Sequence, residues 1–179
     1  MRVIAGKYRG RALKGPKHEG VRPTADRIKE AMFNILGARI QGAAFLDLFA
    51  GTGGIGIEAL SRGASSVVFA DRNLSSVKLI HQNVKILHLD EKVRVLHLSF
   101  ERAADLLAKE NFQFDLIFLD PPFEDGILIK AIEKILDWNL IRNEGIIIAE
   151  HPRKIILNIP ELQGETRNYG DICLTFFNK

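Results

Sequence analysis

The sequence predicts an α/β fold built on a mostly parallel seven-stranded sheet with helices on both faces. Three observations predict it. From position 44 onward, short apolar runs rich in Val, Ile and Phe alternate with helical segments. A glycine-rich turn directly follows the first of these runs. Near the C-terminal end, two strand-like stretches flank Gly170-Asp171, which predicts a hairpin and therefore a C-terminal antiparallel strand.

The elements follow from periodicity and turn residues. Within residues 21–36, Ile28, Met32 and Leu36 recur at helical spacing after Thr24, a residue suited to cap a helix start, so a helix is expected to follow Thr24. The expected strands are 44–49, 66–70, 93–98, 114–120, 145–150, 165–169 and 172–177, and the helices between them are 55–62, 75–87, 102–109 and 126–138.

Length and composition describe one globular domain. The 179 residues are 46% hydrophobic and 26% charged, and no apolar run approaches the roughly 18 residues of a membrane span. We expect a single domain over 1–179, with a basic arm and helix over 1–40 and a catalytic core over 41–179. The first residues contain no apolar signal segment, so a cytoplasmic location and no membrane partner are expected.

The residues typical of disulfides and metal sites are sparse. Cys173 is the only cysteine, which excludes an internal disulfide and a cysteine-based metal site. The five histidines are scattered without ligand spacing, and His151, just past an expected strand, is best explained as a structural residue. We therefore expect no metal and, by default, a monomer.

The positive charge is concentrated at the N-terminus. Residues 1–17 contain six Lys or Arg side chains and no acid, whereas the chain as a whole carries only +3, so the remainder carries −3. A basic arm on a slightly acidic body predicts a polyanionic partner, with nucleic acid the first choice. A solvated basic tail would show the same pattern. Glycines at 6, 10 and 15 favour an adaptable loop or hairpin over a helix.

The most informative motif is Asp120-Pro121-Pro122-Phe123, at the end of an apolar strand. Two prolines stiffen the turn and hold the preceding residue extended. The Asp120 carboxylate and the Pro121 carbonyl can then converge as acceptors beside an aromatic ring. Such a corner suits an exocyclic amine on a nucleobase, which offers two N–H groups and a π-face. Asp-Pro also begins ordinary loops, which is the alternative explanation.

The glycine turn predicts a nucleotide-type cofactor. Gly51, Gly53 and Gly56 match G-x-G-x-x-G between a strand and a helix, a pattern shared with NAD-binding proteins. Asp47, just upstream, suits a cationic or amine group better than a pyrophosphate. Asp71 ends the second strand and can accept both ribose hydroxyls of an adenosine, and the alternative is that it caps the next helix.

Parallel strands bring their carboxyl ends to one edge, where a ligand is expected. Asp47, Asp71 and Asp120 should therefore lie together. Ser99 and Phe100 follow the third expected strand and would neighbour an adenine ring, although both could simply pack in a loop.

With this combination of glycine turn, strand-end acids and Asp120 corner, the chain resembles a Rossmann-like class I S-adenosylmethionine-dependent methyltransferase. More narrowly, it resembles the bacterial RsmD-type enzymes that methylate a guanine N2 in 16S ribosomal RNA. The glycine loop and the Asp-Pro-Pro-Phe turn indicate the broad class. Two N-terminal blocks, one at residues 2–11 and one between residues 22 and 34, indicate the narrow one. The resemblance rests on residues 2–11, 22–27, 29–30, 33–34, 47–64, 120–123 and 167–170.

The resemblance implies S-adenosylmethionine as cofactor and 16S rRNA in the small ribosomal subunit as partner. The implied catalytic residues are Asp120, Pro121, Pro122 and Phe123. The residues expected to bind the cofactor are Thr24, Asp47, Phe49, Gly51, Gly53, Asp71, Arg72, Ser99 and Phe100. Those expected to bind RNA are Arg2, Lys7, Tyr8, Arg9, Arg11, Arg22 and Arg27.

Three other functions compete. An amine methyltransferase acting on DNA adenine N6, cytosine N4 or a protein glutamine would use a similar turn. A nicotinamide-dependent oxidoreductase shares the glycine loop but leaves the Asp120 corner and the basic arm unexplained. An RNA-binding module with a vestigial cofactor fold would lack affinity for S-adenosylmethionine.

Overall fold

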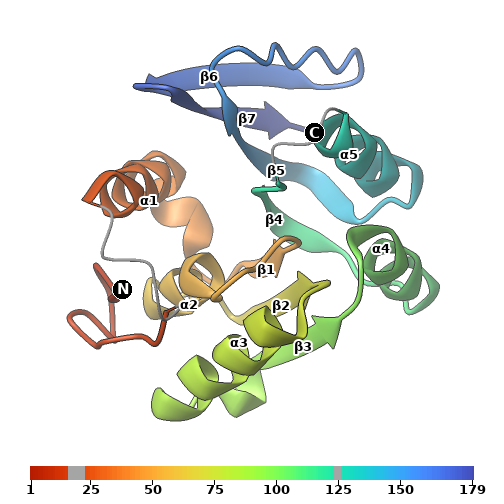
Figure 1. Cartoon of the computed structure of the whole chain (residues 1–179). Coiled ribbons are helices and arrows are strands. Elements are labelled where there is room, and N and C mark those ends of the chain that lie inside the picture. Colours follow the sequence, from red (N-terminus) through yellow and green to blue (C-terminus); the bar gives the residue numbers. More distant parts are fainter. Residues whose placement is uncertain (16–22, 123–125) are drawn as a thin grey trace.

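The computed structural model describes residues 1–15, 23–122 and 126–179, with residues 23–25 described as backbone only. Its helices and strands follow the expected alternation along the chain (Figure 1). They are α1 (Pro23–Leu36), η1 (Gly37–Ile40), β1 (Ala44–Asp47), α2 (Gly54–Ser61), β2 (Ser66–Asp71), α3 (Leu74–Ile86), η2 (Asp90–Lys92), β3 (Val93–His97), α4 (Phe100–Lys109), β4 (Phe114–Leu119), α5 (Ile127–Asp137), β5 (Ile141–Pro152), β6 (Gln163–Tyr169) and β7 (Ile172–Asn178).

The sheet has seven strands in the order β3-β2-β1-β4-β5-β7-β6. Strands β1 to β5 pair in parallel, and β7 runs antiparallel to both of its neighbours. The predicted fold class, with its C-terminal antiparallel strand, is confirmed. The chain moves outward from β1 to β3 and then returns to place β4 on the other side of β1. In α/β proteins ligands bind where the strand order reverses, which in this sheet is at the carboxyl ends of β1 and β4.

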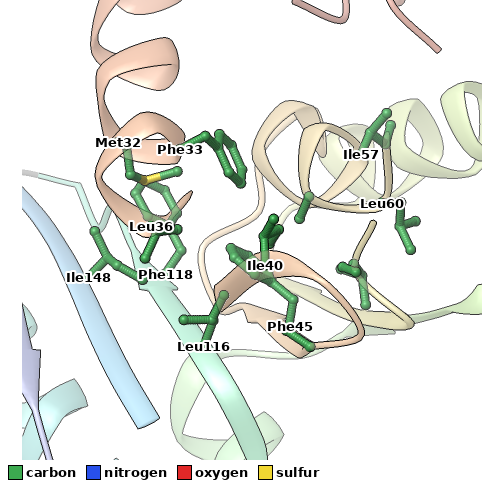
Figure 2. Close-up of a cluster of buried hydrophobic side chains, with 14 of the residues drawn as sticks. Met32, Phe33, Leu36, Ile40, Phe45, Ile57, Leu60, Leu116, Phe118 and Ile148 are labelled. Atoms are coloured by element: carbon green, nitrogen blue, oxygen red, sulfur yellow. The ribbon is translucent and has the colours of Figure 1, made fainter. Parts of the chain in front are cut away.

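Helices cover both faces of the sheet (Figure 1). Helices α1, α2 and α3 contribute to one apolar cluster, and α4 and α5 contribute to a second. Figure 2 shows the first cluster, in which Met32 and Leu36 of α1 lie against Phe118 of β4 and Ile148 of β5. The N-terminal segment joins this same core, because Val3 and Leu13 are buried in it.

Several boundaries differ from those predicted by one or two residues, and the start of β5 differs by four. Strand β5 begins at Ile141 rather than at 145, because Ile141 pairs with Phe114 before a register shift. Residues 142–145 form the irregular part, where Glu144 takes a left-handed φ of 64°. Helix α4 begins at Phe100 rather than at 102, with Ser99 extended at the N-cap position, where its side chain makes no capping hydrogen bond.

In the described part of the chain, no helix is long and apolar enough to cross a membrane. Across the same residues, His, Cys, Asp and Glu side chains form no group of three or more that could hold a metal ion.

Candidate active site

The glycine loop between β1 and α2 has the conformation that its glycines permit. Gly51 and Gly53 adopt left-handed φ values of 52° and 77°, which favour glycine. A Cβ on Gly51 would meet nothing within 4 Å, so the loop is open on that side. At Gly56 a Cβ would lie 2.3 Å from Cε1 of Phe69, so this glycine lets α2 pack closely on β2.

Asp47 ends β1 beneath this loop and is 1% exposed. Its Oδ2 accepts a hydrogen bond from the Gly56 N–H at 3.1 Å, whereas its buried Oδ1 has no partner among the residues that the structure describes. Burial raises the pKa of the Asp47 carboxyl to about 7, and the charges of Asp120 and Asp71 add to that rise. A buried oxygen without a partner fits a ligand that brings a donor, such as the ammonium group of a methionine moiety.

Asp71 ends β2 and is half-buried. Its Oδ2 accepts the Gly51 N–H at 2.8 Å, and its Oδ1 accepts the Asn73 N–H at 2.7 Å. The carboxylate thus ties the glycine loop to β2 while its remaining lone pairs stay available for hydroxyl donors. Arg72 is exposed, and its carbonyl lies 3.1 Å from Nε2 of His97.

An aromatic pair lies next to the strand ends. The rings of Phe49 and Phe100 are 5.4 Å apart between centroids and tilted by 42°. Both residues are half-buried, as is Ser99. The expected helix began at 102, so Ser99 and Phe100 were predicted to lie in the loop before it. In the structure Phe100 is the first residue of α4, and its ring packs against Phe49, in the segment that follows β1. This pair forms an apolar wall of the kind that a planar ring can contact.

The Asp120 corner follows β4 directly. Pro121 is buried, whereas Asp120 and Pro122 are exposed. Although Asp120 is open to solvent on one side, the surrounding protein raises the pKa of its carboxyl to about 6 through desolvation. Phe123, the predicted stacking residue, lies outside the described residues.

A second carboxyl group beside Asp120 was missed by the sequence analysis. Glu150 is half-buried near the carboxyl end of β5. Burial and the nearby charge of Asp120 raise the pKa of Glu150 to about 8. The available signal was an acid at the end of the fifth parallel strand, which is the same signal that identified Asp47, Asp71 and Asp120.

His151, which follows Glu150, does not contribute to this edge. It is buried, with Nε2 2.8 Å from Oγ1 of Thr175 and Nδ1 3.0 Å from the Pro152 carbonyl oxygen. This agrees with its expected structural role. Cys173 is also buried, as expected for a small core residue.

The basic arm folds back on itself, as its glycines suggested. The Val3 N–H donates to the Arg11 carbonyl at 3.0 Å, and the Gly10 N–H donates to the Val3 carbonyl at 2.9 Å. We call residues 1–13 the N-terminal hairpin. Its predicted RNA-binding cations all have exposed side chains, and Tyr8 is half-buried below Lys7, whose Nζ lies 5.5 Å from the ring centroid. The exposed cations are Arg2, Lys7, Arg9 and Arg11, joined by Arg27 on α1.

Glu58 of α2, completely buried, holds this hairpin. Its two carboxylate oxygens accept hydrogen bonds from the Ile4 N–H at 2.8 Å and the Ala5 N–H at 2.9 Å. Arg62 donates to the same carboxylate, and the Lys29 Nζ lies 3.7 Å away. Burial lowers the pKa of Lys29, and the charge of Glu58 partly offsets this. No local sequence pattern marks this cluster, because Glu58, Lys29 and the hairpin residues lie far apart in the chain.

Asn83 of α3 connects the end of the arm to the glycine loop. Its Oδ1 accepts the Lys14 N–H at 2.7 Å, and its Nδ2 donates to the carbonyls of Lys14 and Thr52. The predicted site residue Arg22 lies outside the described residues, as does the side chain of Thr24.

The fold and this site define a Rossmann-like class I methyltransferase, in which acids and a glycine loop line the carboxyl edge of the sheet. The chain belongs to the family described as Conserved hypothetical protein 95, whose model matches residues 1–178. The family predicted from the motifs is thereby confirmed.

Relatives of this chain carry a more specific name. Ribosomal RNA small subunit methyltransferase D of Haemophilus influenzae is 37% identical, over 90% of this chain and 83% of the relative. The protein of the same name from Escherichia coli K12 is 35% identical, over 84% of this chain and 74% of the relative. A solved Escherichia coli structure covers 100% of this chain and 97% of its own, with a TM-score of 0.88 and 30% identity.

Proposed function

We propose that this protein transfers a methyl group from S-adenosylmethionine to the exocyclic N2 amine of a guanine in the RNA of the small ribosomal subunit. One observation carries the proposal. The Asp120-Pro121 corner follows β4 at the point where the strand order reverses, next to the glycine loop and to Asp47. Relatives named ribosomal RNA small subunit methyltransferases support RNA as the substrate.

S-adenosylmethionine supplies an electrophilic methyl group on a sulfonium centre. The chain would hold this cofactor through Asp47, whose unpaired Oδ1 accepts an ammonium donor, and through Asp71, which accepts ribose hydroxyls. The Phe49–Phe100 pair would contact the adenine ring. Gly51 leaves open space for close approach of the cofactor to the backbone.

The chemistry at the amine depends on positioning. The lone pair of the guanine amine is delocalised into the ring, which makes the nitrogen a poor nucleophile. The Asp120 carboxylate and the Pro121 carbonyl would accept hydrogen bonds from the two N–H groups of the amine. These contacts would turn the nitrogen lone pair toward the methyl carbon. The N–C bond forms as the S–C bond breaks, and the nitrogen then loses one proton to Asp120 or to water. Phe123 would stack on the extruded base.

The exposed cations of the N-terminal hairpin would contact RNA phosphates. Because Val3 and Leu13 are part of the core, the RNA contacts are better tested by neutralising charge than by deleting the arm. We expect the double variant Arg9→Gln, Arg11→Gln to bind RNA more weakly than wild type. The slope of log affinity against log salt concentration should become less negative by about two, one for each phosphate contact removed. Lys109→Gln on α4 serves as the matched control. An unchanged slope in the double variant would reject the hairpin as the RNA contact.

The direct test of the function supplies labelled S-adenosylmethionine with unmodified small subunits, free ribosomal RNA and DNA. Nucleoside mass spectrometry of the product should identify N2-methylguanosine in RNA. Methyladenine or methylcytosine would instead indicate the competing amine methyltransferases, and an absence of cofactor binding would indicate an RNA-binding module.

Replacing Asp120 with Ala tests the catalytic corner. We expect Asp120→Ala to abolish methyl transfer while S-adenosylmethionine affinity, measured by calorimetry, changes little. Normal turnover in this variant would remove Asp120 from the mechanism.

A further inference from the structure

Glu150 lies beside Asp120 on the neighbouring strand. Leu119 of β4 pairs with Ala149 of β5, so the next positions along these parallel strands are Asp120 and Glu150. Side chains alternate between the two faces of a sheet. Phe118 and Ile148 both point into the cluster beneath α1 (Figure 2), so Asp120 and Glu150, two residues further on, project from that same face.

The strand order puts Glu150 on the side of Asp120 away from the proposed cofactor. Asp47 and Asp71 lie on β1 and β2, whereas Glu150 lies on β5, across β4 from them. The backbone of Glu150 pairs with Leu174 in the sheet, but within residues 1–15, 23–122 and 126–179 neither the Asp120 carboxyl group nor the Glu150 carboxyl group has a hydrogen-bond or ion-pair partner. A half-buried carboxyl group beside the reacting corner is therefore available to a substrate.

The protonation states of the Asp120 and Glu150 carboxyl groups determine which hydrogen bonds they can make with a bound base. Because burial and Asp120 raise the pKa of Glu150 to about 8, Glu150 keeps a proton at neutral pH. A protonated carboxyl group has one O–H donor and a carbonyl oxygen that still accepts. The O–H can donate to the Asp120 carboxylate, which leaves the Glu150 carbonyl oxygen for a donor on the base.

We propose that Glu150 is a specificity-determining residue, which accepts a hydrogen bond from the ring N1–H of the target guanine while Asp120 holds the N2 amine. The inference rests on the proposed function. Guanine carries a ring N–H next to its amine, whereas adenine and cytosine carry a ring acceptor at that position. The adjacent acceptors Asp120 and Glu150 match the two neighbouring donors of guanine, N1–H and the N2 amine. On adenine or cytosine the Glu150 oxygen would face a ring acceptor, which is unfavourable.

The first experiment compares wild type with Glu150→Leu, which keeps a similar volume without oxygens, and Glu150→Gln, which keeps a neutral carbonyl acceptor. On small-subunit RNA we expect Glu150→Leu to lose about 10- to 100-fold in kcat/KM, the loss typical of an unmade hydrogen bond in a polar site. Glu150→Gln should stay within about threefold of wild type, since its acceptor remains. Glu161→Ala, at an exposed acid, is the matched control, and Glu150→Ala replaces the Leu variant where that variant does not fold.

The second experiment replaces the mapped target guanine with 2-aminopurine, which retains the amine but has a ring acceptor in place of N1–H. Wild type should prefer guanine by at least tenfold, and Glu150→Leu should lose most of that preference while S-adenosylmethionine affinity stays within twofold. Equal losses on both bases, a matching loss of cofactor affinity, or an unchanged preference would overturn the inference. A wild-type protein that methylates no guanine would reject the proposed function itself, which is a distinct result.

Discussion

Replacing Asp47 with Asn should stabilise the ligand-free protein at neutral and alkaline pH. Asp47 is 1% exposed, its Oδ1 has no partner in the described part of the chain, and burial raises its pKa from 3.8 to about 7 in the folded protein. An acid with a raised folded pKa costs stability as pH increases from its unfolded value to its folded one. The cost therefore begins near pH 4 and is complete above about pH 7.

The size of this effect follows from the same values. A rise in pKa from 3.8 to about 7 corresponds to about 4 kcal/mol of unfolding free energy, at 1.36 kcal/mol for each pH unit. Asn removes the charge and can still accept from the Gly56 N–H, but its amide also needs partners in the same site. We therefore expect about half of the maximum, roughly 2 kcal/mol, or an increase in Tm of about 4–8 °C at pH 8.

Thermal unfolding monitored by circular dichroism from pH 8 down to pH 4 checks this expectation. The stability gain of Asp47→Asn should shrink as the pH falls, and the exposed control Asp90→Asn should show no such trend. The same variant should bind S-adenosylmethionine about 10- to 100-fold more weakly, because it removes the charge that we propose meets the ammonium group of the cofactor. A gain that is constant with pH, or a loss of stability at pH 8, would refute the reasoning.

Two further predictions concern the hairpin support and the reacting corner. Glu58→Gln should lower the free energy of unfolding in urea by about 3 kcal/mol, because it leaves a backbone donor of the hairpin unpaired and Lys29 without its buried partner; a change within about 0.5 kcal/mol would contradict this. Methyl transfer in single-turnover experiments should fall as the pH drops through about 6, because Asp120 accepts hydrogen bonds best when ionised; a flat profile between pH 5 and 8 would count against that role.

Periodicity and turn residues were enough to predict the architecture. Apolar runs, helical spacing and the Gly170-Asp171 turn placed each of the seven strands, and their boundaries differed by one or two residues apart from the start of β5 at Ile141. The start of β5 was missed because the polar residues 142–144 separate Ile141 from the apolar run that begins at 146, and the ladder shifts its register there.

The sequence by itself determined which acids gather at one edge, because strands that run in parallel bring their carboxyl ends together whatever their lateral order. Asp47, Asp71 and Asp120 were found on that basis. Only the tertiary structure decided which strands are neighbours, and with that the pairing of Asp120 with Glu150. It also decided that Glu58 anchors the N-terminal hairpin, because a contact across 53 or 54 residues of sequence leaves no local pattern.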